Sequence, residues 1–330
     1  MINIAQIGIG YWGPNLLRNL IKNSHCKIMK IIEIDPIRIK FVSDNFPNIK
    51  ISTNLDDVLN DTNIDAVVIS TPAKTHFNIA IKCLRANKHI LVEKPIATTV
   101  KEAIKLFSLA EKKNLVAMSG HTFLFNSAVR FIKKYIENGE LGDLIYIFTQ
   151  RLNLGRIRND INAMWNFAPH DISIIQYWLN NTPHNALSYN GRSYIQKNID
   201  DVGFLTIQYP DNILANIHVG WLNPNKVRKI TLIGSKKMIE YDDLLKNKVS
   251  IVDKGIDIIH NLDENMEFDK NNFKINYRSK SVLKPKIEYH EPLKVEIDHF
   301  LDCIKKNIIC LTGKDHSINV VKILEESNPL

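Results

Sequence analysis

The segment that most constrains the fold is GIGYWG at residues 8–13, a G-x-G-x-x-G pattern that follows an apolar stretch and opens a helix-like one. The helix-like stretch, residues 12–23, carries apolar side chains at helical spacing. Gly8 permits a tight turn, Gly10 lets a diphosphate approach the backbone, and Gly13 lets the helix pack closely on the strand. The N–H groups and positive dipole end of such a helix attract phosphate. The pattern therefore predicts a dinucleotide-binding unit.

An acidic residue follows at the spacing that this unit requires. Glu33 lies twenty positions after Gly13, at the end of the second predicted strand, where a carboxylate accepts hydrogen bonds from ribose hydroxyls and repels a 2′-phosphate. NAD is therefore expected rather than NADP. Asp35 competes for the same role, and Arg38 leaves NADP open. The expected cofactor contacts in this region are Gly8, Gly10, Tyr11, Trp12, Gly13, Glu33 and Arg38.

The first 120 residues alternate strand-like and helix-like segments, which predicts right-handed βαβ units and an α/β fold with a doubly wound parallel sheet. Residues 66–70 are almost wholly apolar, as in a strand covered on both faces. The predicted strands are 2–8, 27–34, 66–70, 89–92 and 115–119, and the predicted helices are 12–23, 36–45, 75–86 and 100–113.

The rhythm changes after residue 120 to strands with little helix between them, which predicts an α+β domain with a mostly antiparallel sheet. A polar stretch at 254–288 is expected to form a long excursion or mobile loop. The predicted helices are 126–137, 171–179, 293–306 and 316–327, and the predicted strands are 144–152, 184–194, 201–209, 213–222, 227–233 and 238–241. We expect a cofactor-binding domain at 1–120 and a domain for substrate binding and oligomerisation at 121–330, with the terminal helix packing back on the first.

Composition narrows the classes of protein. A chain of 330 residues with 45% hydrophobic and 24% charged residues is an ordinary globular protein. It has no apolar run of membrane-spanning length and no secretory start, so a cytoplasmic protein is expected. The net charge of +8 comes from dispersed lysines, so we expect no nucleic-acid partner. Four cysteines without a C-x-x-C pair predict buried, inert thiols and no metal site.

Two further segments end predicted strands of the parallel sheet, at the edge where ligands bind. Thr71 and Pro72 close one strand, with His76 on the following turn, and Glu93 and Lys94 close another. A lysine at this edge can hold a substrate hydroxyl and help to lower its pKa. A lone lysine such as Lys94 is more often a surface residue in an ion pair.

The combined motifs resemble the Gfo/Idh/MocA oxidoreductase family. They are GIGYWG at 8–13, STPAKTH at 70–76, VEKP at 92–95, GHTFLFN at 120–126 and NFAPHD at 166–171, and the likeness continues to EPLKVEIDHFLDCI at 291–304. The resemblance implies a Rossmann domain followed by a domain with a large open-faced sheet. It also implies a cis peptide before Pro95, with Lys94 beside the nicotinamide of NAD.

The resemblance also implies the catalytic residues. His170 corresponds to the family's usual group for proton transfer with the substrate hydroxyl, and its ordinary pKa suits that task. Members often have an acid four residues earlier, where this chain has Asn166, so a two-base scheme is in doubt. Asp171 either orients His170 or interacts with the helix dipole. Lys94 and His170 are the expected catalytic pair, and His121, Asn126 and Asn166 are expected at the substrate.

The stretches GYWGPNLLRN and RLNLGRIRNDINAMWNFAPHDIS at 151–173 resemble bacterial members that oxidise the C3 hydroxyl of UDP-N-acetylglucosamine or its uronic acid. The 3-keto product of those members goes to an aminotransferase. Arginines in this half either bind the diphosphate or face solvent or a partner subunit. The candidates are Arg151, Arg156, Arg158 and Arg192.

Three alternatives remain open at this point. The substrate is a nucleotide sugar, or it is a free sugar or inositol, or the protein is a non-catalytic NAD-responsive regulator. The exposed face of the second sheet is expected to make a homodimer or homotetramer.

Overall fold

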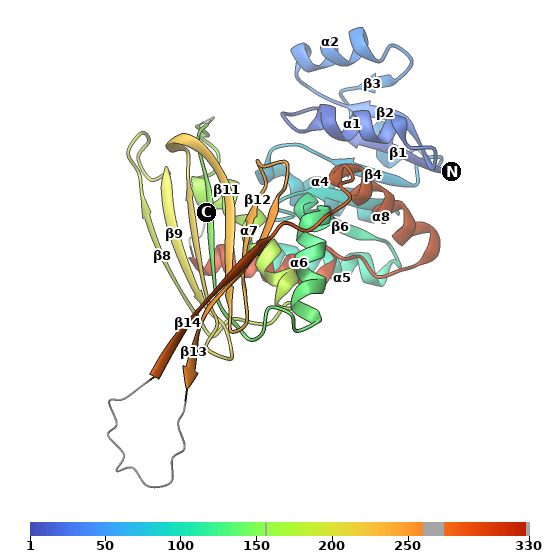
Figure 1. The fold of residues 1–330 in the computed structure, drawn as a ribbon. Helices are drawn as coiled ribbons and strands as arrows, with labels where there is room; N and C mark the ends of the chain where they lie inside the picture. The colour runs from blue at the N-terminus through green and yellow to red at the C-terminus, as the bar shows by residue number, and fades with distance from the viewer. Residues whose placement is uncertain (156, 260–273, 328–330) are drawn as a thin grey trace.

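The computed structural model describes residues 1–155, 157–259 and 274–327, which fold around two β-sheets (Figure 1). One sheet is parallel and lies in the N-terminal third of the chain, and the other is mostly antiparallel and is built from residue 144 onward. The expected fold class, a doubly wound parallel sheet followed by an α+β part with an open-faced sheet, is confirmed.

The first sheet has six parallel strands in the order β3-β2-β1-β4-β5-β6. Its central strand β4 is buried along its whole length because helices cover both faces. The chain order reverses beside β1, so the carboxyl ends of β1 and β4 meet at the edge where a ligand binds. The strands are β1 (Ile2–Ile7), β2 (Cys26–Ile32), β3 (Lys50–Ser52), β4 (Ala66–Ile69), β5 (His89–Glu93) and β6 (Ala117–Gly120).

The helices of this part begin at residues that suit helix starts. Pro14 lies in the first turn of α1, Asp35 caps α2 by accepting from the N–H groups of Ile37 and Arg38, and Thr99 caps α5. The sequence predicted all the larger elements but missed β3 and α3, which are too short to show a period. The helices are α1 (Gly13–Lys22), α2 (Pro36–Asn45), α3 (Asp56–Leu59), α4 (Ala73–Arg85) and α5 (Val100–Lys112).

The second sheet has eight strands in the order β14-β13-β12-β11-β7-β10-β9-β8, and only β7 and β10 pair in parallel. Its strands are β7 (Leu144–Leu154), β8 (Ala186–Arg192), β9 (Val202–Gln208), β10 (Leu214–Gly220), β11 (Leu222–Gly234), β12 (Met238–Asp242), β13 (Val249–Ile259) and β14 (Lys274–Leu283). The polar excursion expected at 254–288 is wrong for residues 254–259 and 274–283, which belong to the β13–β14 hairpin at the sheet edge. Residues 260–273 of that expectation lie outside the described ones.

Helices α6 (Ser127–Glu137) and α7 (Ala163–Trp178) cover one face of the second sheet, and η1 (Thr122–Phe125) is a short 3₁₀ turn before α6 (Figure 1). The predicted start of α7 at 171 is wrong, because the helix begins at Ala163 behind a cap in which Asn162 accepts from the N–H of Trp165. Pro169 lies inside this helix. His170 and Asp171 therefore lie in the middle of α7, and Asp171 is not a charge at its N-terminus.

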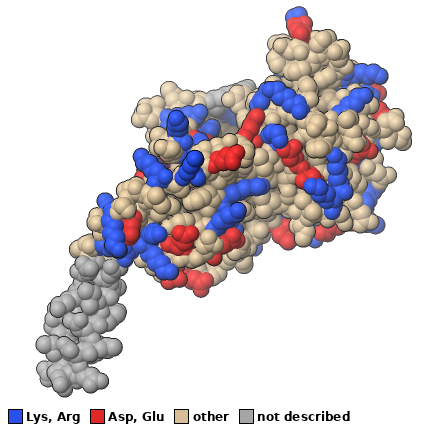
Figure 2. Space-filling model, turned by 45° about the vertical axis from the view of Figure 1, so that its right-hand side comes forward, with Lys and Arg blue, Asp and Glu red and all other residues tan. Residues whose placement is uncertain are grey.

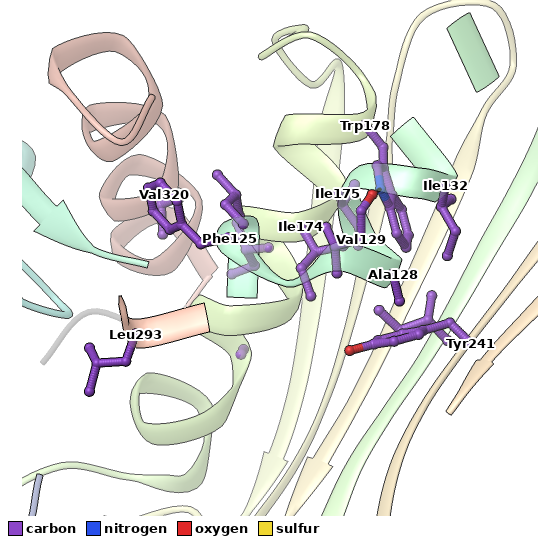
Figure 3. Close-up of a cluster of buried hydrophobic side chains, with 14 of the residues drawn as sticks. Phe125, Ala128, Val129, Ile132, Ile174, Ile175, Trp178, Tyr241, Leu293 and Val320 are labelled. Carbon is purple, nitrogen blue, oxygen red and sulfur yellow. Dashed lines mark hydrogen bonds between the residues drawn. The ribbon is translucent and has the colours of Figure 1, made fainter. Parts of the chain in front are cut away.

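The last two helices, α8 (Pro292–Lys306) and α9 (Lys314–Ser327), return to the first sheet. Arg18 of α1 pairs with Glu291, and Val321 of α9 packs in the core between the parallel sheet and α5. A larger core continues from the first strand into the second sheet. Figure 3 shows part of it, where Phe125, Trp178 and Tyr241 lie with Leu293 and Val320 from the last two helices. The two sheets are thus joined by shared apolar packing.

Basic and acidic side chains are interspersed over the face of the molecule drawn in Figure 2. Among the described residues, no helix is both long and apolar enough to cross a membrane.

Candidate active site

The glycine turn lies against the end of β4. Gly8 has a φ of +86°, and a Cβ at this position would lie 2.7 Å from the Cγ2 of Thr71. A Cβ on Gly10 would lie 3.2 Å from the carbonyl oxygen of Ser70, and one on Gly13 would lie 3.1 Å from that of Gly8. The positive φ and the close contact therefore require glycine at position 8, whereas a side chain at Gly10 or Gly13 would press against a backbone oxygen.

The turn also leaves hydrogen-bond donors for a ligand. Among the hydrogen bonds of residues 1–155, 157–259 and 274–327, none uses the backbone N–H of Gly10, Tyr11 or Trp12. These groups lie at the N-terminus of α1, where the helix dipole favours an anion. The Tyr11 side chain is also largely exposed, and that of Trp12 is 38% exposed. The turn fits the diphosphate of a dinucleotide such as NAD.

Glu33 lies beside this turn. Its carboxylate accepts from the N–H of Ile9 at 2.6 Å, and from those of Ile34 and Asp35 at 2.8 and 3.0 Å. Asp35 is used as the cap of α2, which leaves Glu33 as the carboxylate at the end of β2 nearest to the turn. A Cβ on Gly10 would lie 3.8 Å from Nη1 of Arg38, so this guanidinium also borders the turn.

Thr71, Pro72 and His76 form the neighbouring corner. Pro72 precedes the first turn of α4, and the buried ring of His76 lies between two carbonyl oxygens, with Nε2 2.8 Å from that of Thr71 and Nδ1 2.7 Å from that of Pro95. Burial lowers the pKa of His76. This histidine therefore links the end of β4 to the turn that follows β5.

Lys94 directly follows β5, and its side chain reaches α7. Its Nζ donates to the backbone oxygen of Asn166 at 2.8 Å, one helical turn before His170. The Lys94–Pro95 peptide bond is cis, as the resemblance implied. Glu93 lies behind the lysine and close to Gly120, whose Cβ would lie 3.3 Å from the Glu93 Oε1. The edge of the parallel sheet and the helix of the second part thus meet at the lysine.

The His170 ring lies in the same region with few protein partners. Phe123 of η1 contacts it edge-on, with ring centroids 5.0 Å apart. Its buried Nδ1 has no hydrogen-bond partner among the described residues. The imidazole is therefore held by packing and is not committed to another protein group.

Burial and neighbouring charges set the protonation states. Burial lowers the pKa of the Lys94 amine to about 8, although the carboxylate of Glu93 opposes this change. Burial also lowers the pKa of His170 well below its usual range, and the positive charges of Lys94 and Arg151 add to this effect. Burial raises the pKa of Glu93. At neutral pH the site therefore combines a neutral imidazole with a lysine that is still mostly protonated.

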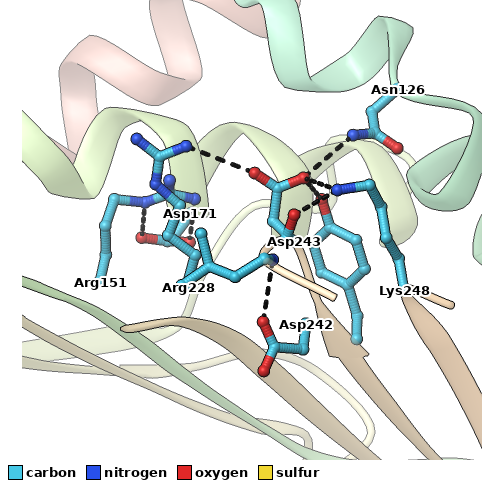
Figure 4. A network of polar contacts seen from close by, with 9 residues as sticks. Asn126, Arg151, Asp171, Arg228, Asp242, Asp243 and Lys248 are labelled. Carbon is cyan, nitrogen blue, oxygen red and sulfur yellow. Dashed lines mark hydrogen bonds and ion pairs between the residues drawn. The ribbon is translucent and has the colours of Figure 1, made fainter. Parts of the chain in front are cut away.

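Arg151 is buried in an ion pair. Its Nε and Nη2 donate to the two carboxylate oxygens of Asp171 at 2.8 and 2.9 Å, as Figure 4 shows. The guanidinium also lies over the Phe123 ring at 4.5 Å. The pair joins β7 to α7 at the residue after His170. Neither of the two roles considered for Asp171 in the sequence corresponds to this contact.

The other arginines are placed differently. Arg158 is one-third exposed, with its Nε donating to Asp160 at 2.8 Å, and its charge is close enough to lower the pKa of Lys94. Arg192 is exposed and donates to the carbonyl of Gly191. Arg156 lies outside the described residues. Of these candidates, Arg158 combines exposure with proximity to Lys94.

Two predicted substrate residues are largely buried. The ring of His121 contacts that of His316 at 5.4 Å between centroids, and its Nδ1 has no partner among the described residues. Asn126 caps α6, with its Oδ1 accepting from the N–H of Ala128, and its Nδ2 lies 3.4 Å from Asp243. Each contributes to the structure around the site.

The structure adds residues that sequence reasoning missed. Asp243, just after β12, receives contacts from Asn126, Arg228 and Lys248 (Figure 4). The charge of Arg228 contributes to the lowered pKa of His170. The sequence around Asp243 does not indicate this role, because two of these partners, Asn126 and Arg228, lie 117 and 15 positions away, although Lys248 is five positions away.

Glu296 of α8 was missed as well. It is fully buried, its Oε2 accepts from the Thr122 hydroxyl at 2.7 Å, and its Oε1 has no partner among the described residues. Burial raises its pKa well above the usual range, and the nearby Glu93 adds to the effect. A buried carboxyl group with a raised pKa thus lies close to Glu93.

A cavity elsewhere in the molecule lies away from these residues. A cavity of about 240 Å³ lies at the amino ends of β4 and β5, on the sheet edge opposite to Lys94. No group of three or more His, Cys, Asp or Glu side chains in the described ranges is arranged to hold a metal ion.

Known proteins are similar to this chain in sequence and in fold. A 2,7-anhydro-N-acetylneuraminate hydratase from Escherichia coli is 24% identical over 257 residues, covering 73% of this chain and 68% of its own. The solved UDP-N-acetylglucosamine 3-dehydrogenase from Acidithiobacillus ferrooxidans has a TM-score of 0.79 at 18% identity, covering 99% of this chain and 96% of its own. GenD2 from gentamicin A biosynthesis, solved in complex with NAD, has a TM-score of 0.81 at 19% identity, covering 99% and 93%. At these identities the two structures establish a common fold.

Family models account for most of the chain. Residues 2–121 match the model of the oxidoreductase family with an NAD-binding Rossmann fold. Residues 129–240 match the GFO/IDH/MocA C-terminal domain. With the glycine turn and the two-sheet architecture, these matches show that the chain is an NAD-binding oxidoreductase of the Gfo/Idh/MocA family.

Proposed function

We propose that the protein oxidises the C3 hydroxyl of UDP-N-acetylglucosamine, or of its uronic acid, to the 3-keto sugar with NAD in the cytoplasm. The product would then be transaminated during the synthesis of a surface polysaccharide or lipid A. The observation that carries the oxidation is the contact of the Lys94 amine with the Asn166 carbonyl, which holds a cation one helical turn from the neutral imidazole of His170.

Each group then has a defined task. His170 accepts the proton of the substrate hydroxyl, because burial keeps its imidazole neutral at the working pH. Lys94 has three N–H donors and uses one on Asn166, so the others donate to the hydroxyl oxygen and stabilise its developing negative charge. NAD supplies the acceptor for the hydride that leaves C3. The alcohol thus loses a hydride and a proton and becomes a ketone.

The cofactor is assigned to the edge formed by β1, β2, β4 and β5. The free N–H groups of the glycine turn hold the diphosphate, and Glu33 bonds the adenosine ribose by exchanging part of its present contacts. Thr71, Pro72 and His76 form the wall beside the turn, and Glu93 and Lys94 lie at the nicotinamide end. His121, Asn126 and Asn166 border the sugar.

The preference for a nucleotide sugar rests on charge. The charge of Arg158 lowers the pKa of Lys94, and the charges of Lys94 and Arg228 lower the pKa of His170, so these three cations lie near one another. A region with such charges favours an anion such as a diphosphate. Arg158 uses Nε and Nη2 on Asp160, which leaves Nη1 as a donor. Arg151 is assigned a supporting role, because Asp171 already holds it. The similarity of residues 151–173 to UDP-sugar dehydrogenases supports the same choice.

The test is a panel of substrates assayed for NADH formation. UDP-N-acetylglucosamine and its uronic acid are compared with free N-acetylglucosamine and inositols, and the product is identified by NMR. We expect NADH and a 3-keto sugar only with a UDP-sugar. Turnover of free sugars or inositols without any UDP-sugar would assign the site to those substrates. NAD binding without turnover of any of them would favour a regulator.

A further inference from the structure

Arg228 of β11 lies on the face of the second sheet that α7 covers. Its partner across the β11–β7 ladder is Arg151, and directly opposite residues of an antiparallel pair project to the same face of a sheet. That face is the one toward α7, because the Arg151 guanidinium donates to Asp171 of that helix. Arg228 is therefore one strand away from the ion pair that holds the segment of His170.

The charges of this cluster do not balance. Arg151 takes both carboxylate oxygens of Asp171. The other carboxylate, that of Asp243, is shared by two cations, with the Nζ of Lys248 3.0 Å from Oδ1 and the Nη1 of Arg228 3.4 Å from Oδ2 (Figure 4). Three cations of the cluster thus face two carboxylates, and the longest of these contacts is the one made by Arg228.

The Arg228 guanidinium keeps most of its hydrogen-bonding capacity. In the described parts of the chain its side chain uses one of its five N–H groups, on Asp243. The Arg228 side chain is 38% exposed, whereas that of Lys248 is 22% exposed and its Nζ contacts both the carbonyl and the carboxylate of Asp243. A guanidinium with a free edge matches a carboxylate, because two parallel N–H groups meet two oxygens. Arg228 is thus available to an anionic ligand.

The next residue along β11 gives a comparison. Side chains alternate along a strand, so Lys229 points to the opposite face of the sheet. Its side chain is 37% exposed, close to the value for Arg228, and its Nζ lies 2.8 Å from Oε1 of Glu240. Two cations of similar exposure therefore differ in pairing, since Lys229 has a close carboxylate of its own and Arg228 shares a more distant one.

Arg228 and Arg158 lie on different sides of the catalytic pair. The charge of Arg228 lowers the pKa of His170, and that of Arg158 lowers the pKa of Lys94. The backbone oxygen of Arg158 accepts from Nε2 of Gln196, in the loop between β8 and β9, at 2.9 Å. In the order of the sheet, β11 lies on one side of β7, and β8 and β9 lie on the other. A ligand held between the catalytic residues thus has an arginine in each direction.

We propose that Arg228 binds a carboxylate on the sugar ring, so that the substrate is the uronic acid of UDP-N-acetylglucosamine rather than the neutral sugar. This inference rests on the proposed oxidation at C3. From C3 of a pyranose, C1 is reached through C2 and C5 through C4, in opposite directions around the ring. The diphosphate on C1 extends toward Arg158, and the carboxylate on C5 extends toward Arg228. The C3 hydroxyl lies between Lys94 and His170.

The neutral sugar lacks the group that this arginine needs. A carboxylate accepts two charge-assisted hydrogen bonds from the guanidinium, whereas a hydroxymethyl group accepts one and leaves the charge of Arg228 uncompensated. Hydrogen bonds of this class correspond to about a 10- to 100-fold difference in affinity. We therefore expect the acid to be preferred by about this factor.

The test measures kcat/KM for UDP-N-acetylglucosamine and for its uronic acid at saturating NAD. The binding of both sugars to the NADH complex is measured separately by calorimetry. Native protein should prefer the acid by about 10- to 100-fold in both measurements. Arg228→Gln should remove most of this preference, mainly through a higher KM for the acid, and Arg228→Lys should retain part of it.

The control is Lys229→Gln, which removes the same charge from the adjacent position on the opposite face and should keep the native preference. Fluorescence titration with NADH shows whether each variant is folded. Equal losses for both sugars in Arg228→Gln, or the same loss of preference in Lys229→Gln, would overturn the role of Arg228.

The result for the native protein separates this inference from the proposed function. Oxidation of both sugars at similar kcat/KM, or a preference for the neutral one, would overturn the carboxylate assignment and leave the oxidation of nucleotide sugars standing. If neither sugar is oxidised, the proposed function fails and calorimetry decides the rest. Tighter binding of the acid that is lost in Arg228→Gln would support the assignment, and equal binding of the two sugars would overturn it.

Discussion

The Lys94 side chain donates to a backbone carbonyl of α7, and this partner determines what the lysine offers to a ligand. A carbonyl fixes the position of the amine without neutralising its charge, whereas a carboxylate would form an ion pair. The charge remains directed at the space between β5 and α7. The amine is thus held in place before any ligand arrives.

Removal of the Lys94 amine should reduce turnover much more than it weakens the binding of NADH. We expect Lys94→Met to reduce kcat by about 10²-fold or more, since the hydroxyl loses its positive partner in the transition state. NADH binding, measured by fluorescence titration, should change much less. The matched control is Lys101→Met on the exposed surface of α5. Unchanged kcat in Lys94→Met would rule out the catalytic role.

The pH profile of kcat/KM should be bell-shaped, and both of its limbs should lie below the ordinary pKa values of lysine and histidine. The alkaline limb should lie near pH 8, because burial lowers the pKa of Lys94 to about 8 and the amine loses its charge above that value. The acidic limb should lie below pH 6.5, because His170 must be neutral and burial depresses its pKa. Lys94→Arg should remove the alkaline limb. An alkaline limb near pH 10 in the native protein would contradict the burial of the amine.

The sequence predicted the residues that local motifs fix and missed those that the tertiary structure brings together. Lys94 and His170 were predictable because each lies in a short segment with its own signature. The partner of Arg151 was not, since Asp171 is twenty positions away on another element. Asp243 and Glu296 were missed for the same reason, because their contacts arise only when distant segments pack.

At the scale of elements, α7 shows why the first residue of a helix is harder to predict than the presence of the helix. The helix is buried on nearly all sides, so it lacks the amphipathic period that marks surface helices, and Pro169 falsely indicates a start near 171. The edge strand β14 was missed because several of its side chains are polar. The alternating elements of the first sheet were predictable, since buried parallel strands are apolar throughout.

The buried pair that joins β7 to α7 should be important for stability. Arg151→Met should lower the free energy of unfolding by about 3–5 kcal/mol, because it leaves Asp171 buried without a partner. The double variant Arg151→Met with Asp171→Leu should recover most of this loss. Urea unfolding of the two single variants and the double variant measures the coupling. Additive effects of the two substitutions would show that the pair makes no joint contribution.

His316 connects α9 to α7 and should make stability depend on pH. Its ring nitrogens lie 2.8 Å from the Ser173 hydroxyl and 2.9 Å from Oδ1 of Asn181, and burial lowers its pKa to about 4. The unfolded histidine takes up a proton near pH 6.5 and the folded one only near pH 4, so stability falls as the pH drops through this window. The loss from pH 7 to pH 5 should be about 2 kcal/mol.

The glutamine variant tests this contribution. His316→Gln keeps hydrogen-bonding groups toward Ser173 and Asn181 but does not titrate, so its unfolding free energy should change about 2 kcal/mol less between pH 7 and pH 5. Urea unfolding at the two pH values provides the comparison. An equal pH dependence in both proteins would assign the effect to other groups, of which His121 is the nearest.

At the scale of the whole molecule, the second sheet has helices on one face only (Figure 1). The pairing register places Tyr146, Phe148, Phe204, Leu214 and Ile233 on the other face, here called the outer face. Three of these, Tyr146, Phe204 and Leu214, are exposed. Because an apolar sheet face is stabilised by contact with a copy of itself, we expect a dimer or tetramer through this surface.

Light scattering coupled to size-exclusion chromatography tests the assembly. The native protein should have at least twice the mass of one chain, and Phe204→Glu should reduce it, because a charge on the outer face opposes close contact. Lys254→Glu is the control, because it introduces the same negative charge at an exposed position of β13 away from these residues. A native protein that elutes as a single chain at micromolar concentration would exclude this interface.

The return of α8 and α9 to the first sheet has a consequence for the order in which the protein is made. The cofactor half is encoded first, yet Val321 completes its core, and Thr312 bonds to the end of β6. During translation, part of the apolar core of the parallel sheet therefore stays exposed until α9 has left the ribosome. Nascent chains halted shortly before residue 290 should therefore attract chaperones, although every residue of the glycine turn is already outside the exit tunnel.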